Sequence, residues 1–291
     1  MPKSTTHRWL AILGWTALGL VLAIYIGLPA AMGIAAVWPS RASVGEPPAG
    51  FEAVTLERAD GVEIAAWYAP PRNGAAIVVA HGAGGSRQGV RRQAEMFAER
   101  GYGVLAIDMS GHGESGGRAN RLAWQGSEDI SAAARYLADE SGVRRIGAFG
   151  SSMGGEAVLG ASAAVPQLEA IVADGATRRS TAELTTLPSK RSLVESFVPR
   201  VMYATVQALA WQRPPAPLLE EMRKAAATRY LLIGAGGNPL ETEFNRYFAE
   251  QIGSRAELWI APGVGHVGAL SRYPEEYERR VMEFYDEALL R

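Results

Sequence analysis

The segment 145–155, Arg-Ile-Gly-Ala-Phe-Gly-Ser-Ser-Met-Gly-Gly, constrains the fold of this chain more than any other segment. It begins with an apolar run typical of a buried strand, and the small residues of 156–165 that follow it are typical of a helix. Between the two lies Gly150-Ser-Ser152-Met-Gly154, a serine with a glycine two positions away on each side. In a tight turn from strand to helix, the serine takes a strained backbone conformation that exposes its hydroxyl. The flanking glycines leave room that a Cβ would block. The segment therefore predicts a strand, a sharp turn and a helix, with Ser152 as a candidate nucleophile.

The same spacing of glycine and serine occurs a second time, in Gly113-Glu-Ser115-Gly-Gly117. A loop is expected before this copy and no helix directly after it, so Ser115 lacks the context that exposes a nucleophile. The overlapping segment 111–116 also matches the G-x-G-x-x-G pattern of dinucleotide-binding loops, but the next helix is expected only near Ser127. The sequence therefore favours Ser152 as the nucleophile and predicts no nucleotide cofactor.

Composition excludes several classes of function. The chain has 291 residues, 48% of them hydrophobic and 20% charged, which is enough for one sizeable domain and an appendage. A net charge of -1 with interspersed signs offers no basic surface, so no nucleic-acid partner is expected. The absence of cysteine excludes disulfides, a thiol nucleophile and cysteine metal sites. The histidines, His7, His81, His112 and His266, are not spaced as metal ligands, and the sequence predicts neither a metal nor any other cofactor.

The N-terminal 40 residues predict a single-pass membrane anchor. No charged residue occurs from Trp9 to Pro39, which exceeds the ~20 apolar residues that a helix needs to cross a bilayer. Lys3 and Arg8 precede this stretch, an arrangement that keeps the N-terminus in the cytoplasm and places the catalytic domain on the extracytoplasmic side. A cleaved signal peptide is the alternative, although its apolar region usually runs only ~7–15 residues. The expected divisions are a cytoplasmic tip and transmembrane anchor at 1–40, a linker at 41–50 and a folded domain at 51–291.

Beyond residue 50 the hydrophobic pattern predicts an α/β fold. Segments 51–58 and 62–68 alternate in polarity around an Asp60-Gly61 turn, which predicts a hairpin. After residue 74, short apolar strands alternate with helices, and this order predicts a mostly parallel sheet covered by helices on both faces. Later strands are expected at 75–80, 103–107, 146–149, 170–173, 230–233 and 258–261. Ligands of such sheets bind at the carboxyl ends of the strands, where Ser152 is expected.

His266 is the candidate general base. A serine hydroxyl is a weak nucleophile until a base takes its proton, and neutral imidazole suits that task near pH 7. His7 precedes the apolar stretch, and His81 and His112 each stand in a His-Gly pair typical of a shaped loop. His266 instead follows the last expected strand in a glycine-rich loop, where a catalytic base is expected.

The acidic partner of this histidine is expected in the loop after strand 230–233, because an imidazole base needs a group that orients it and stabilises its cation. Asn238 stands where an aspartate is expected, and an amide carries no charge. Glu241, three residues on, has the charge and a longer reach, and we take it as the preferred candidate. The alternatives are Asn238, Glu243 and Asp174.

Two backbone N–H groups are candidates for the oxyanion hole. Ala83 lies in the glycine-rich loop His81-Gly-Ala-Gly-Gly after an expected strand, and Met153 opens the helix that follows Ser152. Donors fixed in this way stabilise the negative charge that develops on a carbonyl oxygen during acyl transfer.

These motifs together make the chain resemble the α/β-hydrolase fold family over roughly residues 51–290. The resemblance is carried by His81-Gly-Ala-Gly-Gly, Asp108-Met-Ser-Gly-His-Gly-Glu-Ser115, Gly150-Ser-Ser152-Met-Gly and His266, with serine, acid and histidine in the order of that family. It implies an eight-stranded, mostly parallel sheet and the hydrolysis of an ester, thioester or amide through an acyl-enzyme. Asn238 departs from the family pattern at the usual position of the acid.

The resemblance also implies a small lid insertion at about 177–228, between two strands of the sheet. This segment is rich in apolar and aromatic residues, notably Phe197, Met202, Tyr203 and Trp211. An apolar lid beside a membrane anchor indicates a small-molecule or lipid-like substrate with an acyl chain.

The sequence thus predicts a membrane-anchored serine hydrolase of the carboxylesterase or lipase kind. The first alternative is a serine peptidase on the same fold, in which an acidic residue of the lid region holds a free amine. The candidates for that role are Glu183, Glu195, Glu220 and Glu221. The second alternative is a non-catalytic binding or scaffold protein with a hydrolase fold, in which Ser152 or His266 would be expected to be replaced.

Overall fold

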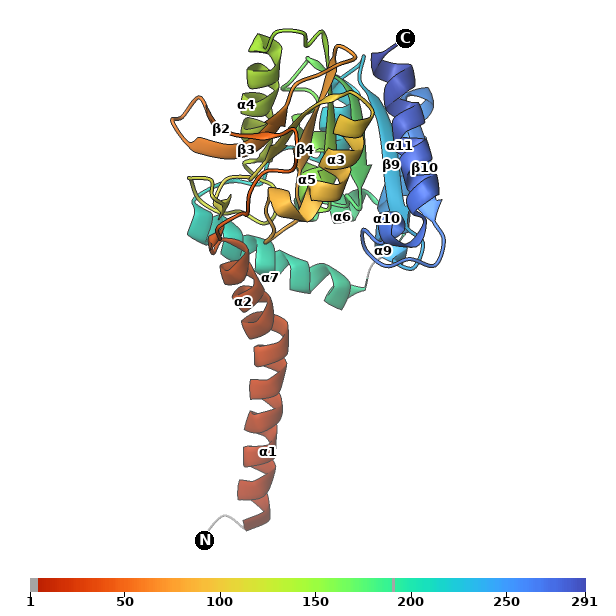
Figure 1. Cartoon of the computed structure of the whole chain (residues 1–291). Coiled ribbons are helices and arrows are strands. Elements are labelled where there is room, and N and C mark those ends of the chain that lie inside the picture. Colours follow the sequence, from red (N-terminus) through yellow and green to blue (C-terminus); the bar gives the residue numbers. More distant parts are fainter. Residues whose placement is uncertain (1–4, 190–191) are drawn as a thin grey trace. The chain divides into compact units, whose positions relative to one another are not determined.

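The computed structural model describes residues 5–189 and 192–291 (Figure 1). The chain divides into two compact units. One contains the residues up to Val37 together with 188–213, and the other contains 38–187 together with 214–291.

The second unit is built on an eight-stranded sheet with the strand order β10-β9-β8-β7-β4-β5-β3-β2. Strands β2 and β3 form the predicted antiparallel hairpin, β3 pairs antiparallel with β5, and the remaining neighbours are parallel. The strands are β2 (Glu52–Glu57), β3 (Glu63–Ala69), β4 (Ala75–Ala80), β5 (Gly103–Ile107), β7 (Arg145–Ser151), β8 (Leu168–Asp174), β9 (Arg229–Ala235) and β10 (Ala256–Ala261). The predicted α/β fold with a mostly parallel eight-stranded sheet is confirmed.

Helices cover both faces of this sheet, as Figure 1 shows. One face packs against α4 (Gly126–Asp139), α5 (Met153–Ala161), α8 (Leu218–Lys224) and α9 (Pro239–Ile252). The other packs against α3 (Arg91–Glu99), α10 (Ala269–Arg272) and α11 (Pro274–Leu289). Strand β4 lies between the two layers, because Ala76 and Val78 pack on the first face while Ile77 and Val79 pack on the second. Burial on both faces explains why β4 reads as a continuous apolar run rather than an alternating one.

The segment predicted as a linker, 41–50, is partly built into the second unit. Strand β1 (Ser40–Arg41) pairs in parallel with β6 (His112–Gly113), and the Val44 N–H donates a 3.1 Å hydrogen bond to Glu114. Val44 is also buried, so the first residues of the segment predicted as a linker pack on the second unit.

The predicted lid insertion at 177–228 is shared between the two units. Its outer parts, α6 (Thr181–Thr186) and α8, belong to the second unit, whereas α7 (Leu193–Ala210) belongs to the first. Both outer parts are held by one buried carboxylate. Glu183 accepts hydrogen bonds from the Arg179 and Ser180 N–H groups at 2.8 Å and from the Leu218 N–H at 2.9 Å.

The first unit consists of α1 (Thr5–Leu22), a π-helical turn (Ala23–Gly27), α2 (Leu28–Ala36) and α7. The helical stretch Arg8–Ala36 has 29 residues and contains an 18-residue window with a mean hydropathy of 2.1, and it is the one candidate membrane span among the described residues. A signal sequence near an N-terminus can meet the same criteria of length and apolar composition. The π-helical turn ends two residues before Pro29, whose missing N–H disturbs the regular helical hydrogen bonds.

Helices α2 and α7 pack closely within this unit and lie side by side in Figure 1. A Cβ built on Gly33 would lie 2.7 Å from the Thr205 Cβ and 2.8 Å from the Met202 carbonyl oxygen, so this approach requires glycine. Pro29, Gly33 and Ala36 are buried and share one face of α2 by their spacing. The helix pair therefore joins the candidate anchor to the middle of the insertion.

Candidate active site

Ser152 lies in the predicted turn between β7 and α5, with φ at +53° and ψ at -115°. A residue with a side chain is strained by about 1–3 kcal/mol at such a positive φ. The turn is closed by glycines that cannot be replaced without displacing backbone. A Cβ on Gly150 would lie 2.1 Å from the Gly154 carbonyl oxygen, and one on Gly154 would lie 2.3 Å from the Ala80 carbonyl oxygen. The Ser152 N–H donates to the Asp174 carbonyl oxygen at 2.7 Å, which ties the turn to β8.

His266 reaches Ser152 from the loop after β10. Its Nε2 lies 2.7 Å from the Ser152 Oγ, and 46% of its side chain is exposed. A Cβ on Gly175 would lie 3.0 Å from the His266 Cε1, so glycine at the end of β8 leaves space for the ring. The histidine predicted from the sequence thus lies within hydrogen-bond distance of the predicted serine.

Glu241 contacts the other nitrogen of the imidazole. Its Oε2 lies 2.7 Å from the His266 Nδ1, and its side chain is fully buried in the first turn of α9. The second carboxylate oxygen, Oε1, accepts the Ala235 N–H at 2.7 Å. With both oxygens hydrogen-bonded, the carboxylate is fixed in orientation.

Asn238 contacts Glu241 rather than the histidine. Its Oδ1 caps α9 by accepting the Glu241 N–H at 3.3 Å, and its Nδ2 donates to the Glu241 Oε2 at 3.3 Å. Asn238 therefore orients the carboxylate, a role that needs no charge. Glu243, two residues farther along α9, points to a different side of the helix from Glu241.

Asp174, the third alternative acid, is buried at the end of β8 and accepts the Tyr277 hydroxyl at 3.0 Å. Burial, together with the negative charge of Glu241, raises the pKa of Asp174 to about 7. The hydrogen-bond partners of the His266 ring among the described residues are Ser152 and Glu241. Asp174 therefore lies outside the hydrogen bonds of the imidazole, and its carboxyl group is bound by Tyr277 instead.

The hydrogen bond to Glu241 raises the pKa of His266 above its ordinary value of 6.5, against an opposing effect of burial. An imidazole whose pKa is raised in this way stays protonated to a higher pH than a free histidine does. A carboxylate beside the ring suits a histidine that takes up a proton.

The loop that contains Ala83 lies against the serine. A Cβ on Gly82 would lie 3.5 Å from the Ser152 Cβ. His81 shapes this loop, since its Nδ1 lies 2.7 Å from the Gly82 carbonyl oxygen and its Nε2 accepts the Met109 N–H at 3.0 Å. Burial lowers the pKa of His81 to about 4, so the ring is neutral and structural, as its His-Gly context predicts. Met153 is the first residue of α5, where an N–H has no partner within the helix.

Ser115, in the second copy of the glycine-serine spacing, is buried away from the imidazole. Its hydroxyl donates to the Asp108 carbonyl oxygen at 2.6 Å and accepts the Ala65 N–H at 2.9 Å. Gly111 has φ at +72°, and a Cβ there would lie 2.2 Å from the Ala119 nitrogen. Glycine at position 111 is therefore explained by the close packing of its loop against Ala119.

A buried ion pair behind the Ala83 loop was not found from the sequence. Arg87 binds both Asp108 and Glu114, and the Arg87 N–H donates to Asp108 at 2.6 Å. The signal that could have found the pair is the polar residue directly after strand β5, at the carboxyl edge where ligands of parallel sheets bind.

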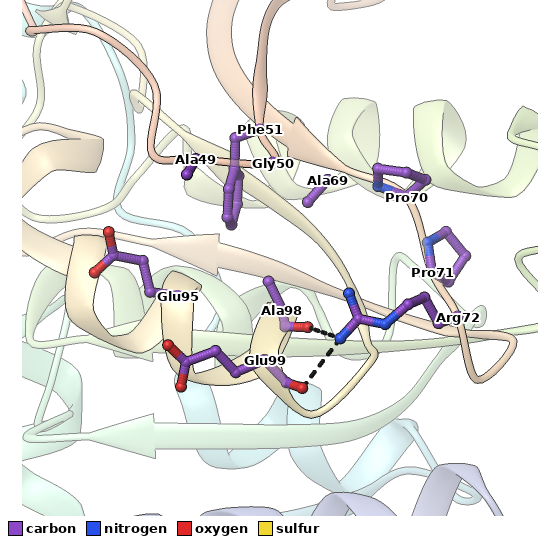
Figure 2. Close-up of a pocket in the computed structure, with 10 residues that line it drawn as sticks. All are labelled: Ala49, Gly50, Phe51, Ala69, Pro70, Pro71, Arg72, Glu95, Ala98 and Glu99. Atoms are coloured by element: carbon purple, nitrogen blue, oxygen red, sulfur yellow. Dashed lines mark hydrogen bonds between the residues drawn. The ribbon is translucent and has the colours of Figure 1, made fainter.

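A cavity of about 610 Å³ lies elsewhere on the second unit, and Figure 2 shows the residues that line it. It is lined in part by Pro70, Pro71 and Arg72, which follow β3, and by Glu95 and Glu99 of α3. Ala69 pairs with Val104 at the start of β5, so the cavity lies at the amino end of the parallel strands, opposite to Ser152. Arg72 is occupied by the Ala98 and Glu99 carbonyl oxygens at 2.8 and 3.0 Å. This cavity is therefore separate from the serine and histidine.

Solved structures with the same fold are α/β hydrolases and esterases. An esterase from Pyrococcus furiosus superposes with a TM-score of 0.68 and 22% identity, over 87% of this chain and 98% of that chain. Est1E from Butyrivibrio proteoclasticus, solved with ferulic acid, superposes with a TM-score of 0.62 and 19% identity, over 82% and 100%. The α/β hydrolase GrgF from a Penicillium species gives 0.64 and 18%, over 82% and 99%. At these identities the likeness shows the fold alone, which is that of α/β hydrolases.

The family model described as "Serine aminopeptidase, S33" matches residues 71–230, more than half of the chain. The chain therefore belongs to this family, and the predicted membership among α/β hydrolases is confirmed. A comparison with curated proteins finds no significant match.

Substitution of Glu241 tests whether it is the acidic partner of His266. Glu241→Gln is expected to lower kcat/KM by a factor on the order of 10³–10⁴, because the amide does not stabilise the imidazolium. In the wild type, the acid limb of the kcat/KM profile is expected to have its midpoint above pH 6.5, and in Glu241→Gln the midpoint should fall. Asn238→Ala, the matched control, should cost less than about tenfold, since it removes a cap rather than a charge. The reverse ranking of the two variants would assign the acidic role elsewhere.

Proposed function

We propose that this chain is a serine hydrolase that cleaves an ester, thioester or amide through an acyl-enzyme formed on Ser152. The observation that carries the proposal is an unbroken chain of contacts. Glu241 lies 2.7 Å from His266, and His266 lies 2.7 Å from Ser152 on its opposite nitrogen. This arrangement orients a base toward a strained, exposed hydroxyl and holds an anion behind the base.

The reaction follows from these contacts. The Ser152 Oγ attacks the carbonyl carbon of the substrate while the His266 Nε2 takes the hydroxyl proton, and Glu241 stabilises the imidazolium. The backbone N–H groups of Ala83 and Met153 hold the oxyanion, each donor being worth a factor of about 10²–10³ in rate. His266 then gives its proton to the leaving group. Water, deprotonated by the same imidazole, cleaves the acyl-enzyme and restores Ser152.

A peptidase would need a carboxylate that is available to bind a free amine, and the candidate carboxylates already have partners within the protein. This favours an ester substrate over a peptide. Glu183 already accepts three backbone N–H groups, and Glu195 accepts the Ser192 N–H at 2.8 Å in a capping box. Glu220 and Glu221 bind Lys224 at 2.8 and 3.1 Å. Each carboxylate considered for amine binding thus has a donor within the protein. A carboxylesterase or lipase-like activity is therefore preferred to a peptidase.

The scaffold alternative is disfavoured by the strain at the serine. A binding protein has no need of a serine at φ +53° with an imidazole 2.7 Å from its hydroxyl. Such strain is maintained where it positions a reacting group.

We propose further that the N-terminal helix anchors the protein in a membrane, with the catalytic domain on the extracytoplasmic side. A helix of 29 residues is about 43 Å long, which exceeds the ~30 Å of a bilayer core. Large apolar side chains along it are exposed, among them Leu13, Trp15 and Ile24. In the same unit, α7 and its C-cap expose Phe197, Leu209 and Trp211. An apolar helix packed on a membrane anchor supports a substrate with an acyl chain.

The proposed nucleophile is tested by labelling with a fluorophosphonate, which reacts with activated serines. The full chain in detergent micelles should be labelled on Ser152, with the site mapped by mass spectrometry. Ser152→Ala should abolish the label, and the neighbouring variant Ser151→Ala should keep it. A label that persists in Ser152→Ala, or is lost equally in Ser115→Ala, would refute the assignment of the nucleophile.

The proposed orientation is tested with engineered cysteines, because the chain contains no natural one. In intact cells a membrane-impermeant maleimide should label Glu250→Cys, on the exposed surface of the second unit, and not Ser4→Cys before permeabilisation. The opposite pattern would invert the orientation. A soluble product that lacks the N-terminal helix would show that this helix is a cleaved signal.

A further inference from the structure

The guanidinium of Arg121 lies beside the proposed oxyanion loop and has no partner among the residues that the structure describes. Its Nε is buried, and it has no hydrogen-bond or ion-pair partner within the described ranges 5–189 and 192–291. Two buried arginines of the same unit are paired: Arg58 binds Asp60 and Asp129 at 2.7 and 2.8 Å, and Arg87 binds Asp108 and Glu114. A partly buried cation without a partner is costly, and a native protein that keeps one commonly pairs it with a ligand.

The guanidinium lies against the loop that contains Ala83. A Cβ on Gly84 would lie 3.5 Å from the Arg121 Cζ and 3.6 Å from its Nη1. Two positions earlier in this loop, a Cβ on Gly82 would lie 3.5 Å from the Ser152 Cβ. Since two residues of chain span at most about 7 Å, the guanidinium is within reach of a small substrate bound at Ser152.

The backbone around Arg121 is held rigidly. The Ala123 N–H donates to the Asn120 carbonyl oxygen at 3.1 Å, and the Leu122 N–H donates to the Asn120 Oδ1 at 3.0 Å. Arg121 is thus the second residue of a tight turn, and Ala123, the last residue of this turn, has φ at +57°. The Trp124 indole N–H donates to the Arg179 carbonyl oxygen at 2.7 Å and ties the turn to the start of the insertion. A cation presented from a fixed turn loses little freedom when it binds.

The charges near Arg121 also favour an anion. His112 is a buried ring whose pKa is lowered by burial and further by the charge of Arg121. Asp108, a buried carboxylate two residues before Ser110 and four before His112, already binds Arg87. The positive charge of Arg121 is therefore not neutralised by the described residues.

We propose that Arg121 binds an anionic group, a carboxylate or a phosphate, on the substrate and so positions the scissile carbonyl over Ser152. This inference rests on the proposed hydrolase function and narrows its substrate class to esters that carry a negative charge close to the cleaved bond. A guanidinium fork matches the planar carboxylate and the phosphate oxygens alike. The anion can belong to a soluble half-ester or to an anionic lipid, and the two arms of the experiment below distinguish these sources.

The experiment compares matched neutral and anionic substrates with the full chain in detergent micelles. The soluble pair is 4-nitrophenyl pentanoate and mono-(4-nitrophenyl) glutarate, which have acyl chains of equal length. The lipid pair is a monoacylglycerol and the corresponding monoacylglycerol phosphate. The variants are Arg121→Gln, Arg121→Lys and, as a matched control, Arg118→Gln, at an exposed arginine three residues earlier.

In at least one pair, Arg121→Gln is expected to lower the ratio of kcat/KM for the anionic substrate to that for the neutral one by about 10- to 100-fold, mainly through KM. Arg121→Lys should retain part of the ratio, and Arg118→Gln should retain all of it. The pair that responds identifies the source of the anion.

An unchanged ratio in Arg121→Gln for both pairs would overturn the inference, as would an equal fall in Arg118→Gln, which would indicate a general effect of surface charge. Fluorophosphonate labelling of Arg121→Gln distinguishes a failure of this inference from a failure of the proposed hydrolase function. A labelled Ser152 with an unchanged ratio contradicts the inference alone. A wild type that is neither labelled nor active contradicts the proposed hydrolase, and the inference with it.

Discussion

The strained backbone at Ser152 is the constraint on which the rest of the site depends. The serine can hold φ at +53° only because Gly150 meets Gly154 and Gly154 meets Ala80 at distances that no side chain allows. This places β7, α5 and the end of β4 in direct contact. The cost of about 1–3 kcal/mol is offset by the burial of apolar strands on both faces of the sheet. The direction of the hydroxyl is thus set by the core of the domain rather than by a flexible loop.

Glu241 and Asp174 are two carboxyl groups near His266 that have different hydrogen-bond partners. Glu241 accepts hydrogen bonds from Ala235 and Asn238 and stands in the first turn of a helix. Asp174 has one hydroxyl donor and a fully buried position, which raises its pKa to about 7. Such separation of two nearby carboxyl groups is a general way to give one of them the charged role. Asparagine at position 238 is then tolerated, because the charge resides one helical turn further on and the amide orients it.

The sheet, the hairpin and the turn at Ser152 could be predicted because local patterns encode them: apolar runs, a hairpin turn and glycine spacing. His266 could be found by elimination among four histidines. The choice of Glu241 over its alternatives could only be a preference, since the reach of a side chain depends on how α9 begins. The pairing of α2 with α7 joins segments more than 150 residues apart and left no local signal. Arg121 was not found either, since the lack of a partner is a property of three-dimensional surroundings and not of sequence.

The account's central claim is that catalysis proceeds through an ester bond on Ser152. The most direct test is to mix the full chain with a 4-nitrophenyl ester, quench with acid within one turnover and measure the intact mass. The account predicts a mass increase equal to the acyl group, located on the peptide that contains Ser152 and decaying on a slower phase than the release of nitrophenol. Turnover without any acylated intermediate, or an acyl group on another residue, would contradict the account.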